Sequence, residues 1–151
     1  MDITFKQFNW KEDLQDILKW HKDMVKIDFP DSRYKRLLFQ RILQKEYKEG
    51  PEGMMILMDE SQKIGFLWLN IRYDPYRERK YGYVHYLYLI PRYRNRGLGQ
   101  KLIKKTEEYF FKRKKLNIIQ LGTGTHNIPA LKLYKKMGYK PRRMILEKYK
   151  E

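Results

Sequence analysis

Residues 89–100 run Leu89-Ile90-Pro91-Arg92-Tyr93-Arg94-Asn95-Arg96-Gly97-Leu98-Gly99-Gln100. They predict an apolar strand that ends at Pro91, a short basic loop, and a helix that begins directly after the loop. The first turn of a helix presents unpaired N–H groups and a partial positive charge, and glycine lets the backbone approach a ligand closely. The segment therefore predicts a pyrophosphate site, although a plain strand–loop–helix connection with surface arginines fits the same residues.

Two common phosphate-binding patterns do not match this loop. A dinucleotide-binding fingerprint needs a third glycine and an acidic residue about 20 positions further on, and neither is correctly placed. A Walker loop needs Gly-Lys followed by Ser or Thr, which is also absent. The loop is therefore of another kind.

The residues before the loop predict two helices and four strands. Apolar residues at helical spacing predict a helix from Trp10 to about Lys26, and Phe29-Pro30 interrupts it. Asp31 or Ser32 is expected to cap a second helix that runs to about Lys48. Alternating or continuous apolar runs predict strands over residues 3–8, 54–58, 64–71 and 81–90, the last of them central in its sheet.

The residues after the loop complete a mixed α/β pattern. A helix is expected to follow from Leu98 to Phe110, then a short strand over 117–121 and a helix over 127–137 that Gly138 ends. Residues 139–149 predict a last strand or pair of strands. No repeat or linker divides the chain, so residues 1–151 are expected to form a single domain.

Composition limits the class of protein. The 151 residues carry a formal net charge of +16, which favours anionic partners such as a phosphorylated cofactor or nucleic acid. The chain contains no cysteine, which excludes disulfides, cysteine metal sites and a cysteine nucleophile. The N-terminus lacks a signal pattern and no apolar run reaches membrane-spanning length, so a soluble cytoplasmic protein with no membrane contact is expected.

A second motif follows the loop at residues 127–139. It reads Asn127-Ile128-Pro129-Ala130-Leu131-Lys132-Leu133-Tyr134-Lys135-Lys136-Met137-Gly138-Tyr139. On a helix, Asn127, Ala130 and Tyr134 share one face. Together with Arg94-x-x-Gly97-x-Gly99, this segment resembles the GNAT superfamily of N-acetyltransferases, whose members pair these two motifs in this order.

The resemblance implies a GNAT-like fold and a cofactor. The fold would be α/β, with a central, mostly antiparallel twisted sheet of six to seven strands flanked by about four helices. Acetyl-CoA would be the co-substrate, with the N–H groups from Arg94 to Gln100 around its pyrophosphate. The cofactor-binding residues that the resemblance implies are Leu87, Leu89, Arg94, Asn95, Arg96, Gly97, Leu98, Gly99, Gln100, Asn127, Ala130 and Tyr134.

The same resemblance implies direct transfer of an acetyl group to a primary amine. Tyr134 would protonate the departing thiolate, since a phenol and a thiol have comparable pKa values. The N–H of Leu89 would polarise the thioester carbonyl. Many family members carry a glutamate base on the central strand. This strand has none, so His85 is the candidate base, with Tyr83 or a water chain as alternatives and a purely structural His85 also open.

Other functions fit parts of the sequence. The basic runs and many tyrosines suit a nucleic-acid or ribosome-binding module, and a non-catalytic acetyl-CoA-binding protein would share the motifs. The three histidines lack the spacing of metal ligands, so no metal is expected. The amine could be a small molecule, a polyamine or a protein amine, and a homodimer is also open. Asp28 and Asp31 could attract a cationic amine or could serve as turn and cap residues.

Overall fold

The computed structural model describes all residues from Met1 to Glu151. Its sheet contains five strands in the order β1-β2-β3-β4-β5. The first four are antiparallel neighbours, and β5 lies parallel to β4. The strands are β1 Ile3–Gln7, β2 Met54–Asp59, β3 Gln62–Asp74, β4 Arg79–Leu89 and β5 Ile119–Leu121.

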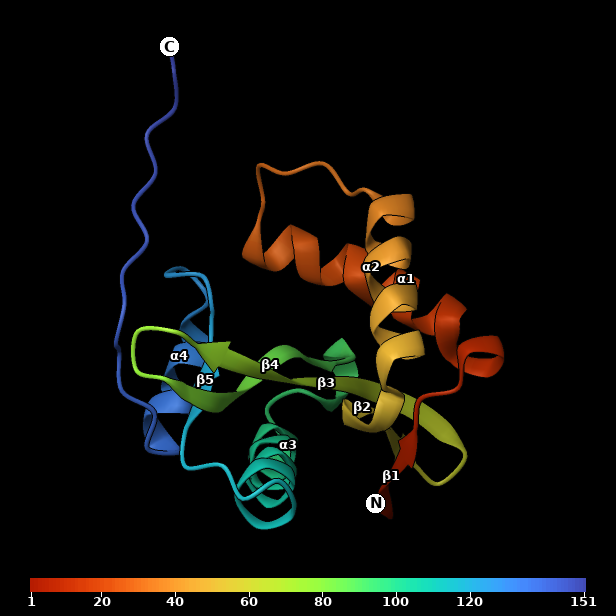
Figure 1. Cartoon of the computed structure of the whole chain (residues 1–151). Helices are drawn as coiled ribbons and strands as arrows, with labels where there is room; N and C mark the ends of the chain where they lie inside the picture. The colour runs from red at the N-terminus through yellow and green to blue at the C-terminus, as the bar shows by residue number, and fades with distance from the viewer.

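Four helices flank the sheet, as the sequence predicts. They are α1 Trp10–Asp28, α2 Arg36–Glu49, α3 Leu98–Glu107 and α4 Ile128–Lys136. A π-helical turn, Glu108–Arg113, extends α3. Figure 1 shows α1 and α2 on one face of the sheet and α3 on the other, with α4 beside the β5 end. The prediction of a mixed α/β fold with a mostly antiparallel sheet is therefore confirmed.

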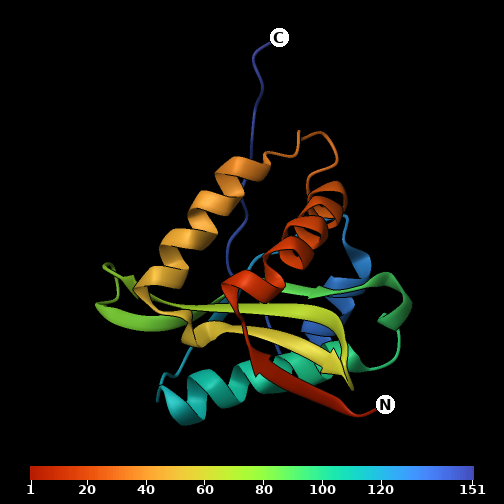
Figure 2. The ribbon, with the colours of Figure 1, turned by 90° about the vertical axis from the view of Figure 1, so that its right-hand side faces the viewer.

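The two faces of the sheet bury separate cores. Leu14, Ile17 and Leu18 of α1 pack with Phe39 and Leu43 of α2 against one face. Leu98 and Leu102 of α3, with Tyr109 and Phe110 of the π-helical turn, pack against the other. The view in Figure 2 shows the sheet as a layer between these helices. The sheet therefore fixes both helical layers relative to β4.

Two predictions about the fold are wrong. The sheet has five strands rather than six to seven, because residues 139–149 form no strand and leave the body as an extended chain. The second helix begins at Arg36 with Lys35 as its N-cap and no side-chain cap, so neither Asp31 nor Ser32 caps it. Strand formation depends on a neighbouring strand, which the tail does not find within the protomer.

Asp13 is a fully buried carboxylate that joins α1 to the sheet. It accepts hydrogen bonds from Lys6 Nζ at 2.9 Å and from the Asn9 N–H at 2.8 Å, and Lys63 Nζ lies 2.8 Å away. Burial alone would raise the pKa of Asp13, but Lys63, the Asn9 N–H and Lys6 together lower it below its ordinary value. The charged carboxylate is therefore a stabilising group that acid removes.

Asp13→Ala should lower the free energy of unfolding at pH 7 by about 3 kcal/mol, because it leaves Lys63 and Lys6 without their buried partner. The matched control is Asp16→Ala, which removes a 2.9 Å ion pair from Lys63 at a half-exposed carboxylate and should cost under about 1 kcal/mol. Because the pKa of Asp13 is lowered on folding, the wild-type advantage should be present above about pH 4 and shrink below it. Urea denaturation between pH 3 and 7 measures both effects, and equal losses in the two variants would contradict this account.

Candidate active site

The site begins where β4 and β5 separate. Only three pairs join them, Gly82 with Ile119, Tyr83 with Gln120 and Val84 with Leu121. Beyond these pairs β4 continues to Leu89 without a partner on that side. The N–H of Ile90 bonds to Ile64 on the β3 side, so by the alternation of a strand the N–H groups of Leu87 and Leu89 point to the open side.

A β-bulge lies at the point of separation. Leu69 pairs with Val84 and its neighbour Trp68 pairs with Tyr86, so His85 is an extra residue in β4. Leu87 and Leu89 belong to the α3 side of the sheet. His85 instead stacks on Trp68 on the α1 side, with ring centres 4.0 Å apart. Strict alternation along β4 would place His85 on the face of Leu87 and Leu89, and the bulge places it on the opposite face.

His85 is deeply set in an aromatic cluster. Its Nδ1 is buried and has no hydrogen-bond partner. Burial, together with the positive charge of Arg72, lowers the pKa of His85 to about 4. Burial and the nearby His85 likewise lower the pKa of His21 on α1 to about 4. Both imidazoles are therefore neutral at pH 7 and can accept a proton, although each is a weaker base than an exposed histidine.

The loop after β4 is held by its own side chains. Arg94 donates from Nε to the Leu89 carbonyl at 2.8 Å and from a terminal nitrogen to Asp23 of α1 at 3.1 Å. Tyr88 donates to the same Asp23 oxygen at 2.6 Å. Tyr93 donates to Asp59 at 2.7 Å. The guanidinium of Arg94 therefore joins the loop to β4 and α1. The backbone N–H of Arg94 is also used, because it donates to the Pro91 carbonyl at 3.1 Å.

The remaining backbone of the loop is open. Asn95 and Gly97 have φ angles of 60° and 75°, and Gly97 is the N-cap of α3 without any side-chain cap. Asn95, Arg96 and Gly97 are exposed, and nothing lies within 4 Å of the position a Cβ would take on Gly97. The first N–H groups of α3, at Leu98, Gly99 and Gln100, have no partner within a helix by geometry. This surface suits an anion.

Helix α4 closes the other side of the separation. A Cβ on Gly99 would lie 2.7 Å from Leu133, so α3 and α4 pack closely where the loop ends. Asn127 caps α4 by accepting from the Ala130 N–H at 3.4 Å and donates to Asp28 at 3.1 Å. Its amide is therefore used within the protein. The Ala130 N–H is used as well, because it donates to the Asn127 side chain.

Tyr134 lies on α4 near the end of α1. Burial and the negative charge of Asp28 raise the pKa of Tyr134 to about 12, and no hydrogen bond contributes to this shift. The phenol is therefore protonated throughout the physiological range. Asp28 and His21 both lie on α1, seven residues and thus about 10 Å apart. Helix α1 thereby brings the surroundings of Tyr134 and His85 to one face of the molecule.

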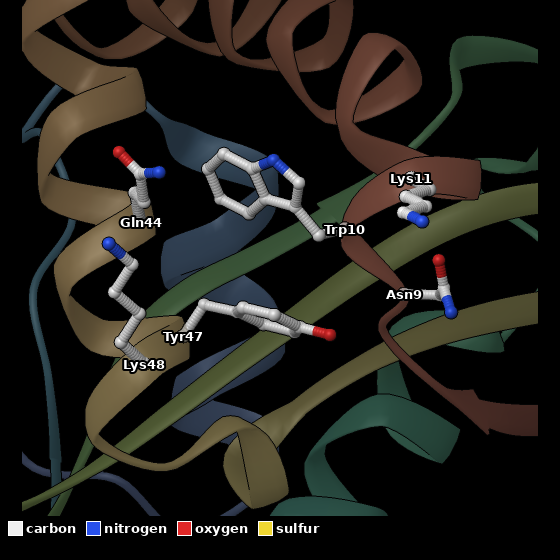
Figure 3. Close-up of a pocket in the computed structure, with 6 residues that line it drawn as sticks. All are labelled: Asn9, Trp10, Lys11, Gln44, Tyr47 and Lys48. Carbon is white, nitrogen blue, oxygen red and sulfur yellow. The ribbon is translucent and has the colours of Figure 1, made fainter.

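Two hollows on the surface bear on the location of the site. One, of about 470 Å³, is lined by Lys19, Trp20, Asp23, Tyr88, Ile90, Pro91 and Arg92, next to the loop. Another, of about 450 Å³, lies between the start of α1 and the end of α2 (Figure 3). Trp10 and Tyr47 line it with Lys11 and Lys48, and none of the predicted site residues reaches it. The residues that the sequence predicts for the site lie instead at the end of β4 and in the elements that follow it.

Sequence reasoning missed the groups on α1 that connect the parts of the site. His21 bonds to the Tyr86 hydroxyl, Asp23 to Tyr88 and Arg94, and Asp28 to Asn127. The 3.6-residue pattern of α1 places His21 on the core face but says nothing of its partners. No group of three or more His, Asp or Glu side chains could hold a metal ion. No helix is long and apolar enough to cross a membrane.

Comparison with known proteins agrees with this geometry. Residues 14–139 match the model of the acetyltransferase (GNAT) family. The chain belongs to the GNAT superfamily of N-acetyltransferases.

Individual relatives are distant. An uncharacterized N-acetyltransferase of Methanocaldococcus jannaschii is 24% identical over 89% of this chain and 60% of its own length. One from Archaeoglobus fulgidus is 26% identical over 82% of this chain and 84% of its own. The fold matches that of a predicted acetyltransferase from Clostridium acetobutylicum with acetyl-CoA, with a TM-score of 0.77 and 16% identity over 97% of this chain and 96% of that one.

The charge on Asp28 can be tested against the phenol it faces. Asp28→Asn keeps an oxygen for Asn127 but removes the negative charge, so the pKa of Tyr134 should fall from about 12. Asp31→Asn, a change at an exposed carboxylate three positions on, should leave it unchanged. NMR titration of ring-labelled tyrosine, with Tyr134 assigned from Tyr134→Phe, measures the pKa. An equal response to both changes would show that Asp28 acts only through the overall charge.

Proposed function

We propose that this protein transfers an acetyl group from acetyl-CoA to a primary amine in a single direct step. The observation that carries the proposal is the separation of β4 from β5 before the loop, which leaves the N–H groups of Leu87 and Leu89 on the unpaired side of β4. Membership of the GNAT family supports it.

The residues present fit acetyl-CoA. The backbone from Asn95 to Gln100, which is exposed at Asn95, Arg96 and Gly97 and continues into the N-terminus of α3, would hold the pyrophosphate, and Arg96 would add charge. The open backbone of Leu87 and the half-buried Ala130 would flank the pantetheine arm. Arg94 and Asn127 would contribute by shaping the site, since their side chains are bonded within the protein. When bound, acetyl-CoA supplies the acetyl group as an activated thioester.

The protein's own groups would then assist the transfer. The N–H of Leu89 is placed to donate to a carbonyl oxygen as negative charge develops on it. The Tyr134 hydroxyl is protonated and uncharged, so it carries the proton that a departing thiolate would take, and its raised pKa makes it a weaker acid than a free phenol. The chain has no cysteine, and direct attack by the amine needs no covalent acetyl-enzyme.

We assign the removal of the amine proton to His85, alone or through water. The ring is neutral at pH 7, because burial and the charge of Arg72 lower its pKa to about 4. With a pKa of about 4, His85 would serve as a proton acceptor over the whole working range. The best test of the activity itself is thiol release from acetyl-CoA against a broad panel of small amines, polyamines and peptide N-termini.

Tyr134→Phe should lower kcat by roughly a hundredfold or more while changing the affinity for acetyl-CoA far less, because the hydroxyl acts as the leaving group gains charge. Gly97→Val is the complementary variant, which should affect the binding of acetyl-CoA rather than turnover. It forces a β-branched residue into a left-handed conformation and should weaken acetyl-CoA binding with a smaller effect on kcat. Steady-state kinetics and calorimetry separate the two. Full turnover in Tyr134→Phe with reduced stability would make Tyr134 a packing residue.

For His85, the pH profile is the sensitive quantity. If His85 accepts the proton, kcat/KM of the wild type, expressed per neutral amine, should hold down to about pH 5 and fall toward pH 4, where the ring becomes charged. His85→Gln should lower kcat/KM and abolish this acidic limb. His21→Gln is the control, because that ring bonds to Tyr86 and should leave the position of the limb unchanged. An identical limb in the folded His85→Gln variant would assign it to another group.

A further inference from the structure

The hollow between the start of α1 and the end of α2 has the composition of a ligand site. Its volume of about 450 Å³ is typical of sites that hold small molecules. Its walls contain aromatic rings, lysines and amides but no carboxylate; they are Asn9, Trp10, Lys11, Gln44, Tyr47 and Lys48 (Figure 3). The lining is therefore positively charged at neutral pH.

Two aromatic rings form one wall of this hollow. Figure 3 shows Trp10 reaching from α1 and Tyr47 reaching from α2 into the space between the two helices. Their ring centres are 5.6 Å apart and their planes are tilted by 39°. Phe8, which is buried, packs nearly at right angles to both rings from the core side. Trp10 and Tyr47 themselves are only half-buried, so a planar molecule can stack on the surface that they leave open.

The protein leaves most polar groups around these rings without partners. The ammonium groups of Lys11 and Lys48 form neither an ion pair nor a hydrogen bond. The Trp10 indole N–H, the Gln44 amide and the Tyr47 hydroxyl likewise form no hydrogen bond, and none of these three groups is buried. All five groups can donate hydrogen bonds, so the hollow favours a ligand rich in acceptors.

The acidic residues next to the two lysines are engaged elsewhere. Glu12, which follows Lys11 in α1, pairs with Lys6 at 3.5 Å. The acidic residue after Lys48 pairs with Lys45 of the same helix at 3.9 Å. The positive charge of the hollow is therefore not neutralised by its neighbours. The net charge of +16 on the whole chain adds a field that attracts anions from a distance.

We propose that this hollow binds a nucleoside phosphate, either as a free nucleotide or as one residue of a single-stranded nucleic acid. The base stacks on Trp10 and Tyr47, and the phosphate binds the ammonium groups of Lys11 and Lys48. The free indole N–H and the Gln44 amide suit the ring nitrogens and carbonyl oxygens of a base. A simple anion would use the lysines alone and leave the rings uncovered. None of these residues belongs to the site at the end of β4, so the proposal does not depend on the transfer reaction.

NMR locates the binding directly. The chain has three tryptophans, and Trp10→Phe assigns the indole N–H signal of Trp10. Titration with uridine monophosphate should shift this signal and leave those of Trp20 and Trp68 in place, because both of those side chains are buried elsewhere. A shift of the Trp20 signal in place of the Trp10 signal would put the nucleotide beside the loop after β4 and overturn the proposal.

The two halves of the nucleotide are tested separately. Uridine and inorganic phosphate should each bind at least tenfold more weakly than uridine monophosphate, since each lacks one of the two sets of contacts. Inorganic phosphate that binds as tightly as the nucleotide would leave only an anion site and overturn the proposal. Hexauridylate that binds at least tenfold more tightly than the monophosphate supports a nucleic acid as the source of the ligand, and equal affinity supports a free nucleotide.

Matched variants test the residues. Lys48→Gln and Trp10→Leu should each weaken the binding of uridine monophosphate at least fivefold, because they remove a phosphate contact and a stacking surface. Lys45→Gln makes the same change of charge on the same helix outside the hollow, and should leave the affinity within twofold. Unchanged indole signals of Trp20 and Trp68 show that each variant folds. Equal weakening by Lys45→Gln and Lys48→Gln would show that only the overall charge matters and overturn the proposal.

Discussion

The bulge at His85 and the end of pairing between β4 and β5 govern the rest of the site. Three pairs hold the strands together as far as Val84, and one extra residue then exchanges the faces of β4. Tyr86 and Tyr88 turn under α1, while Leu87 and Leu89 keep their side chains on the α3 side and their N–H groups toward the gap. Without the bulge, the tyrosines that anchor α1 would point to the wrong layer.

Residues of helix α1 contact the separate parts of the predicted site and fix the spacing between them. His21 contacts Tyr86, Asp23 holds Tyr88 and Arg94, and Asp28 holds Asn127 at the start of α4. These three residues lie within two turns of one helix, so a rigid rod sets the spacing between the bulge, the loop and α4. The loop after β4 is held at its base in the same way, since Arg94 and Tyr93 both direct their side chains inward. Only the backbone and the outer arginines of the loop face outward.

The sequence predicted well those features that local chemistry dictates. The helix that follows the loop directly at Leu98 and the helix that ends before Gly138 were both predicted and are confirmed. The face of His85 could not be predicted, because a bulge is decided jointly by two strands. Leu37, Leu38 and Ile42 fit a helical face but are exposed, since α2 buries Phe39 and Leu43 instead. The strand expected over 139–149 failed for the same reason as the bulge: pairing needs a neighbour that the residues themselves do not specify.

The outer arginines of the loop carry a kinetic consequence. The guanidinium carbons of Arg92 and Arg96 lie 5.5 and 5.6 Å from the centre of the Tyr93 ring, and Asp59 fixes that ring by its hydroxyl. Two cations are thus held in place on the outside of the loop after β4. Held charges attract an anion from a distance and raise its rate of capture, but they retain an equally charged product by the same field. If the loop binds the anionic co-substrate proposed above, the ionic strength that slows its arrival hastens the departure of the product, so turnover is greatest at an intermediate salt concentration.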